Sequence, residues 1–176
     1  MLNVLKRPPM YDEEAVQPMR DELTAVGIQE LRTPEDVEKA IKVNDDKTVL
    51  VVMNSVCGCA AGGARPGVSL ALQNAVIPDR LTTVFAGQDR DAVDLVRSYI
   101  PAPPSSPSMA IFKNGEPVYF MPRYEIEGYT FEQIADKLKA AFEKHCSAKG
   151  PSVSPEHYAQ VQHAKMCGSK IPMYKG

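Results

Sequence analysis

Two cysteines separated by a single glycine, Cys57 and Cys59, are the residues best suited to chemistry in this chain. An apolar, β-branched run at residues 49–53 leads towards them, and small residues follow. This pattern is typical of thiols placed between the end of a strand and the start of a helix. The partial positive charge of a helix N-terminus favours thiolate over thiol. Because the thiolate is the nucleophile in disulfide exchange, the pair predicts thiol–disulfide chemistry.

The spacing of the pair assigns the two sulfurs different roles. Cys57 comes first after the strand and is expected to be the exposed nucleophile, while Cys59 lies one residue deeper as the second thiol. Gly58 allows a close approach of the backbone. Residues two apart in a regular helix point to nearly opposite sides, so a Cys57–Cys59 disulfide needs a non-helical first turn. Strain in that small ring makes the disulfide easier to reduce. We therefore expect a poor reductant of ordinary protein disulfides. The spacing favours a thiol that takes a mixed disulfide onto itself, or an oxidant or isomerase.

Two competing interpretations of the cysteine pair are weaker. The pair could be two small buried hydrophobic residues, but a glycine between them and a helix start after them argue otherwise. The pair could also supply two of the four ligands that zinc normally takes. No second Cys-x-x-Cys follows, so we predict no metal site. The candidates for the missing ligands would be His145, Cys146, His163 and Cys167.

Three further residues have open roles. Arg65 either attracts the carboxylates of a small thiol, or is a surface arginine or a helix-packing residue. Cys167, on the C-terminal tail, is a candidate resolving thiol for a mixed disulfide on Cys57, with a spectator role as the alternative. Cys146 follows the last long helix and is expected to be structural or incidental.

Composition narrows the class of protein. The chain has 176 residues, 44% hydrophobic and 24% charged, with a net charge of -2. This balance gives no electrostatic reason to expect a nucleic acid or an anionic membrane as partner. Residues 1–9 lack an apolar core for a signal peptide, and no run approaches the ~18 apolar residues that span a bilayer. We expect a cytoplasmic protein, in which a close cysteine pair is catalytic or metal-binding rather than part of a disulfide framework.

Hydrophobic periodicity predicts alternating strands and helices, and hence an α/β domain with a mixed sheet flanked by helices. The Asn114-Gly115 pair predicts a hairpin between the last two strands. Pro18 is placed near the start of the first helix, and Pro66 is expected to kink the third. Strands are predicted at 28–31, 48–54, 81–86, 108–112 and 117–121, and helices at 13–26, 33–44, 60–75, 91–99 and 130–144.

The pattern also suggests a division of the chain. Residues 1–146 are predicted to form one domain, of which residues 1–30 are an N-terminal arm. Residues 147–176 form a C-terminal extension that is flexible or contains a short helix over residues 155–165. A proline- and glycine-containing stretch at 150–155 resembles a linker.

The order of elements, with cysteines at the first long strand-to-helix turn, resembles the thioredoxin fold. Residues 106–116 strengthen the likeness, because they are similar to the thioredoxin segment in which a cis-proline precedes a strand and a Lys-Asn-Gly hairpin. The resemblance implies that Pro107 holds a cis bond opposite the cysteines. Without it, Pro107 would be expected to be trans, since only ~5–6% of X-Pro bonds are cis.

A narrower resemblance joins two motifs, Asn54-Ser55-Val56-Cys57-Gly58-Cys59-Ala60-Ala61-Gly62 with Ala64-Arg65-Pro66, and Pro104-Ser105-Ser106-Pro107-Ser108. Together they resemble the bacilliredoxins, thioredoxin-like bacterial proteins with a Cys-Gly-Cys site, over about residues 12–145. The family is implicated in removing bacillithiol, a small cytosolic thiol, from mixed disulfides on proteins. The resemblance implies S-thiolated client proteins as partners and the small thiol as co-substrate, with no bound cofactor.

The sequence departs from thioredoxin at two positions that matter. The tryptophan before the first cysteine is Val56 here, and the buried carboxylate six residues before that cysteine falls on Val51. No internal base for the second thiol is therefore visible. Other interpretations stay open beside the bacilliredoxin one: a disulfide isomerase or oxidant, and a metal-binding or redox-sensing module that uses the same cysteines. The sequence does not decide the oligomeric state.

Overall fold

The computed structural model describes residues 6–161 and 171–176, and its centre is a five-stranded mixed sheet in the order β1-β4-β2-β5-β6. The strands β1 and β2 run parallel to β4, while β5 is antiparallel to β2 and β6 is antiparallel to β5. This arrangement confirms the predicted mixed sheet. The strands are β1 Gln29–Glu30, β2 Thr48–Asn54, β4 Arg80–Phe85, β5 Ser108–Lys113 and β6 Glu116–Met121.

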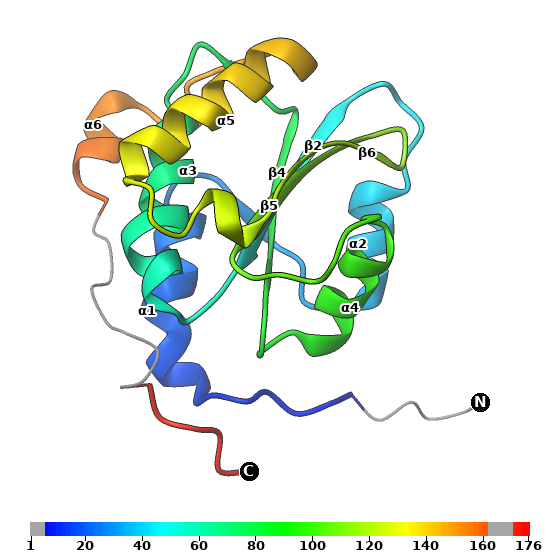
Figure 1. The fold of residues 1–176 in the computed structure, drawn as a ribbon, viewed down its shortest axis with the longest axis vertical. Helices are drawn as coiled ribbons and strands as arrows, with labels where there is room; N and C mark the ends of the chain where they lie inside the picture. Colours follow the sequence, from blue (N-terminus) through cyan, green and yellow to red (C-terminus); the bar gives the residue numbers. More distant parts are fainter. Residues whose placement is uncertain (1–5, 162–170) are drawn as a thin grey trace.

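Helices cover both faces of the sheet, as Figure 1 shows. Helices α1 Glu13–Thr24, α3 Arg65–Ala71 and α5 Phe131–His145 lie on one side. Helices α2 Pro34–Ile41 and α4 Arg90–Ser98 lie on the other. The central strand β2 is buried along its whole length, which explains its near-continuous apolar sequence.

Side chains of β2 alternate between two hydrophobic clusters, as the period of two in a strand requires. Leu50 and Val52 join the cluster that includes residues of α3 and α5, whereas Val49, Val51 and Met53 join the one that includes residues of α2 and α4. Helix α5 contributes Ile134, Leu138 and Phe142 to the core, all fully buried, and Phe131 at its start is half-buried.

Local signals in the sequence account for several element boundaries. Thr33 and Thr130 each cap a helix through a capping box, with Asp36 and Gln133 as the respective partners. Asn114 has φ 52° and the glycine after it has φ 80°, the positive values that a two-residue hairpin turn needs.

Three features of the secondary structure differ from the prediction. Helix α1 begins at Glu13 as predicted, capped by Asp12, but Pro18 lies in its interior rather than near its start. The predicted helix at 60–75 is a π-helical segment, Ala60–Ala64, followed by α3, which already ends at Ala71. The residues after it form β3 Val76–Ile77, which pairs with β7 Ala148–Lys149 in a two-stranded sheet that the sequence did not predict.

The described parts of the C-terminal extension pack against the rest of the chain. The stretch at 150–155 is not a free linker, because the amide of Gly150 donates to the carbonyl of Ala75 at 2.8 Å and that of Ser152 to Leu72 at 2.9 Å. The predicted helix at 155–165 is described only as α6 Pro155–Ala159. Beyond residues 162–170, Ile171 is buried, and Met173 forms an isolated bridge with Tyr11.

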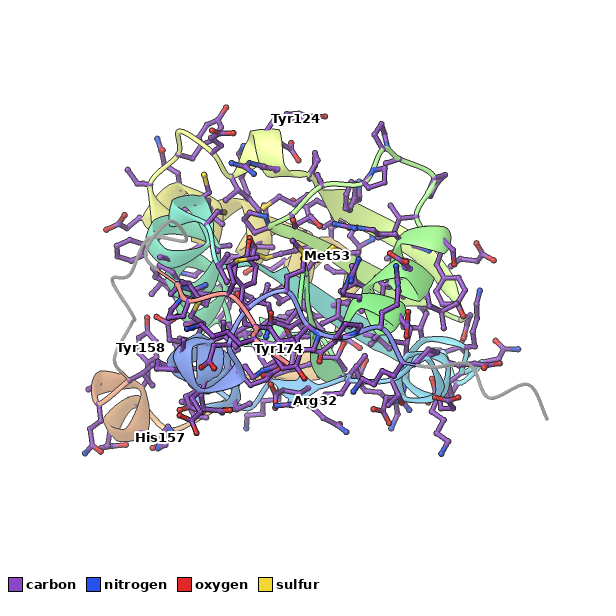
Figure 2. All side chains as sticks on the ribbon, turned by 90° about the horizontal axis from the view of Figure 1, so that it is seen from below. Arg32, Met53, Tyr124, His157, Tyr158 and Tyr174 are labelled. Atoms are coloured by element: carbon purple, nitrogen blue, oxygen red, sulfur yellow. The ribbon has the colours of Figure 1, made fainter. Side chains whose placement is uncertain are left out.

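This arrangement of a mixed sheet between two helical layers is a thioredoxin-like fold, as predicted. Figure 1 places the N-terminal arm and the C-terminal segment at the same end of the molecule, where the bridge between residues 11 and 173 joins them. Figure 2 views the molecule from that end and shows Tyr174 of the C-terminal segment over its middle. Among the described residues, no helix has the length and apolar character needed to cross a membrane.

Candidate active site at the Cys-Gly-Cys turn

The Cys-Gly-Cys sequence lies between the end of β2 and the π-helical segment, which is the position that the sequence predicted. The carbonyl oxygen of Cys57 accepts the amides of Ala60 at 3.1 Å and Ala61 at 3.2 Å, so helical hydrogen bonding begins directly at this residue. Cys59 already has helical backbone angles. Both cysteines are half-buried and present as free thiols. The turn therefore offers two thiols at the start of one helical segment.

The environment of Cys59 differs from that of an exposed cysteine. Burial raises the pKa of the Cys59 thiol above its ordinary value, and the negative charge of Cys57 raises it further. The guanidinium of Arg123 acts in the opposite direction, but the net direction is upward. A raised pKa keeps Cys59 protonated at neutral pH. That state suits a thiol that acts second.

Arg123 is a site residue that sequence reasoning missed. It lies in the short 3-10 turn η2 Arg123–Glu125 that follows β6, and its side chain is 42% exposed. Its Nη2 is 3.9 Å from the Sγ of Cys59, and its Nη1 donates to the carbonyl of Ser106 at 3.3 Å. The pKa of Arg123 is raised, with the charge of Cys57 as the largest cause. No local motif marks an arginine that lies 64 residues from the cysteine that it contacts.

The peptide bond between Ser106 and Pro107 is cis, which confirms the expectation drawn from the thioredoxin resemblance. Arg123 contacts both Ser106 and Cys59, and so places the proline loop beside the cysteine turn. The same loop is held by the hydroxyl of Ser105, which accepts the amide of Arg123 at 3.3 Å. The structure thus brings Pro107 and the cysteine pair into one site, as the sequence implied.

The expectation that Arg65 attracts the carboxylates of a small thiol is wrong, and the packing alternative is correct. Its side chain is 0% exposed and forms an ion pair with Glu22 of α1. Its Nη1 donates to the carbonyl of Ser55 at 2.7 Å and to the side chain of Asn54 at 3.1 Å. Buried in this way, Arg65 holds the residues that lead into the cysteine turn, and its guanidinium faces no solvent where a ligand could arrive.

The approach to Cys57 is further fixed by a chain of hydrogen bonds. The side-chain amide of Asn54 donates to the carbonyl of Met19 at 3.2 Å, and its oxygen accepts the amide of Ser55 at 2.8 Å. The hydroxyl of Ser55 in turn accepts the amide of Cys57 at 3.3 Å. Polar groups buried in this way need partners, and here the partners fix the position of the Cys57 backbone.

A buried carboxylate, that of Glu22, lies near the cysteine turn. It comes from helix α1, whereas the resemblance to thioredoxin pointed to strand β2. Val51, where thioredoxin has its carboxylate, is a buried core residue of β2. Glu22 is brought in instead by α1, and its carboxylate forms an ion pair with Arg65. The N-terminal arm is therefore an integral support of the site.

Among the described residues, the other sulfur and histidine candidates add no ligand at this turn. Cys146 is half-buried just after α5, where burial raises its pKa. Cys167 and His163 lie outside the described residues. Within the described ranges 6–161 and 171–176, no group of three or more His, Cys, Asp or Glu residues is placed to hold a metal ion.

Comparisons with known proteins identify relatives of the whole domain. A family model described as "Disulphide isomerase" matches residues 11–146. The chain is 50% identical over 143 residues to a bacilliredoxin of Salinibacter ruber, covering 80% of this chain and 83% of that protein. It is 51% identical over 137 residues to a bacilliredoxin of Halalkalibacterium halodurans, covering 77% and 94%.

Among solved structures, the chain is similar to a mutant thioredoxin of Halobacterium salinarum, with 18% identity and a TM-score of 0.48 over 72% of this chain and 96% of that one. The family assignment rests on the sequence relatives, which share about half of their residues over most of their length. The chain belongs to the bacilliredoxins, a family of thioredoxin-like oxidoreductases.

Proposed function

We propose that this protein removes bacillithiol, or a similar small thiol, from mixed disulfides on client proteins. The observation that supports this most is the inequality of the two thiols. Cys57 stands at the start of the helical segment, while burial raises the pKa of Cys59. A two-step transfer needs one thiol that attacks the client disulfide first and a second thiol that reacts only afterwards.

In the first step, the Cys57 thiolate attacks the small-thiol sulfur of the client disulfide. A new Cys57–small-thiol disulfide forms, the old disulfide bond breaks, and the client leaves as a thiolate that takes up a proton from water. No net oxidation occurs, because one disulfide replaces another. The positive charge of Arg123 attracts negative charge on the sulfurs of Cys57 and Cys59. Disulfide exchange moves negative charge from one sulfur to another, so Arg123 lies next to the charge that moves.

In the second step, a thiolate attacks a sulfur of the adduct. If the attacking group is Cys59, it attacks the sulfur of Cys57, an intramolecular disulfide forms and the small thiol leaves reduced. A second disulfide exchange with an external thiol must then restore both cysteines. If the attacking group is a free small thiol, it attacks the small-thiol sulfur of the adduct. The disulfide of two small thiols is released, and the Cys57 thiolate is restored directly. Cys167 stays a candidate for the resolving role: slower recycling in Cys167→Ser would assign it, and unchanged recycling would make it a spectator.

Substitutions of the two cysteines test this assignment. Cys57→Ala is expected to abolish transfer of the small thiol from an S-thiolated client, measured by mass spectrometry of the client. Cys59→Ala is expected to leave the first transfer largely intact, because Cys59 acts only afterwards. Transfer retained in Cys57→Ala would overturn the proposal, and loss of the first transfer in Cys59→Ala would show that the nucleophile is misassigned.

A second candidate function is disulfide isomerisation, which the description of the matching family model favours. The same Cys57 thiolate would then attack disulfides within a scrambled protein. Refolding of a scrambled disulfide protein separates the two functions, because the isomerase alone accelerates it in the absence of any small-thiol adduct. A cytoplasmic location fits either function, since both need the thiols reduced.

A further inference from the structure

A cavity of ≈270 Å³ opens beside the active site. One part of its wall is Ser55 and Val56, which directly precede Cys57, and another is Ser106, which directly precedes Pro107. Tyr11, from the N-terminal arm, and Arg97, from the last turn of α4, complete the part of the wall that matters here. Cys57 itself does not line the cavity, but the residues directly before Cys57 and directly before Pro107 do, so the cavity adjoins both segments of the site.

Arg97 is the charged residue in this wall, and it is unusual among the arginines of the protein. Within the described residues, six others form ion pairs with carboxylates, namely Arg7, Arg20, Arg32, Arg65, Arg80 and Arg123. Arg90 donates to the carbonyl of Pro8. The side chain of Arg97 forms no hydrogen bond or ion pair with any of the described residues, and its Nε atom is buried without a partner.

An unpaired, partly buried guanidinium is costly unless something binds it, because burial of a polar group without a hydrogen bond is unfavourable. A carboxylate is the natural partner, since its two oxygens match the fork of guanidinium donors. Ligand pockets commonly measure ~300–1,000 Å³, so a cavity just below that range fits a fragment of a small molecule rather than a folded segment of a protein. Because the cavity adjoins the residues before Cys57, the molecule in question is one that forms a disulfide with Cys57.

We propose that Arg97 binds a carboxylate of the small thiol while that thiol is joined to Cys57, and so determines which small thiols the site accepts. This inference rests on the proposed function, and it names Arg97 as the specificity-determining residue. Arg123, by contrast, contacts Cys59 and is already paired with Glu127. Arg65, the residue expected to bind carboxylates, is enclosed, and Arg97 takes over the expected role from another helix.

The test measures how fast the reduced full-length protein reacts with two disulfides that contain no client. Bacillithiol disulfide carries carboxylates, and 2-hydroxyethyl disulfide is neutral. Arg97→Gln is expected to slow the reaction with bacillithiol disulfide about tenfold, the size of a lost hydrogen bond to a charged group, and to change the reaction with the neutral disulfide less than about twofold. Arg90→Gln, which changes a half-buried arginine at the start of the same helix, is expected to leave both rates unchanged.

A measurement on the unmodified protein makes the test independent of folding of the variant. Malate, a dicarboxylate without a thiol, is expected to slow the wild-type reaction with bacillithiol disulfide and to spare the neutral disulfide. Equal slowing of both reactions in Arg97→Gln, combined with no selective effect of malate, would overturn the inference. So would a loss that appears only with client mixed disulfides, because the carboxylate would then belong to the client.

Failure of the proposed function gives a different result. If wild-type protein fails to react with bacillithiol disulfide but reacts with the neutral one, the proposed function fails. The role of Arg97 is then judged on glutathione disulfide, which also carries carboxylates, against the same neutral disulfide. No difference between wild type and Arg97→Gln in that comparison would overturn the inference about Arg97 by itself.

Discussion

The Nη2 of Arg123 lies 3.9 Å from the Sγ of Cys59, and the same guanidinium binds the carbonyl of Ser106 at 3.3 Å. One side chain therefore links the second cysteine to the residue that precedes the cis-proline. Each disulfide exchange moves a negative charge from one sulfur to another, and a fixed positive charge beside the sulfurs stabilises the thiolates. This contact makes Arg123 a candidate catalytic residue that no sequence motif indicated.

Removing the charge of Arg123 is expected to slow the second step of the reaction. In Arg123→Gln, release of the small thiol from the Cys57 adduct should fall by about tenfold or more, because a hydrogen bond to a charged group contributes ~1.5–3 kcal/mol. Rapid alkylation and mass spectrometry of the adduct measure this rate. Arg80→Gln, which breaks an ion pair with Asp45, is the matched control. Equal release rates in wild type and Arg123→Gln would show that the contact has no catalytic role.

The pH dependence of Cys59 follows from its environment. Burial and the charge of Cys57 raise its pKa above the ordinary 9.0, so the reactive thiolate is scarce at neutral pH. Alkylation of Cys59 in the wild-type protein should therefore still accelerate as the pH rises past about 9. Because Arg123 lowers this pKa, Arg123→Gln should move the profile to higher pH. A profile for Cys59 that levels off below about pH 8 would contradict the assignment of Cys59 as the slow, second thiol.

The pair of Glu22 and Arg65 is expected to contribute strongly to stability, since both side chains are almost wholly enclosed. Glu22→Gln leaves the guanidinium buried without its counter-charge, and breaking such a pair costs ~3–5 kcal/mol in the free energy of unfolding. Urea unfolding measures the loss. Glu35→Gln, in the first turn of α2, is the control and should change stability by less than ~0.5 kcal/mol. A similar small effect in Glu22→Gln would mean that the pair is dispensable.

The C-terminal segment is expected to brace the N-terminal arm next to the active site. Ile171 is only 6% exposed and packs in a cluster with Val56, the neighbour of Cys57, while Met173 is 55% exposed. Ile171→Ala should cost ~2 kcal/mol or more, and Met173→Ala close to nothing. Hydrogen exchange of residues 10–16 should accelerate in the first variant only. Unchanged exchange in Ile171→Ala would show that the segment does not support the arm.

Features determined by neighbouring residues could be predicted from the sequence, whereas features determined by contacts between distant residues could not. The strand β2, the hairpin at Asn114 and the two capped helices rest on local patterns, and the structure confirms them. The two-residue strands β3 and β7 depend on pairing between residues 76–77 and residues 148–149, which no local pattern records.

The residues of the candidate site also fall into two groups, those marked by a local motif and those that only the fold brings to the site. The cysteines and Pro107 lie in motifs, and the structure brings them together. Arg65 lies in a motif as well, but its role depends on burial against Glu22 from a distant helix, which the motif does not contain. Arg97 and Arg123 come from α4 and from the turn after β6, and only the fold brings them to the cysteines.

The most direct test of the central claim is the site of the first adduct. Reduced protein is mixed with bacillithiol disulfide, quenched by alkylation, and analysed by intact and peptide mass spectrometry. We expect a mixed disulfide on Cys57, with Cys59 alkylated at early times and joining only slowly. Absence of any adduct, or an adduct confined to Cys167, would contradict small-thiol removal by the Cys-Gly-Cys site.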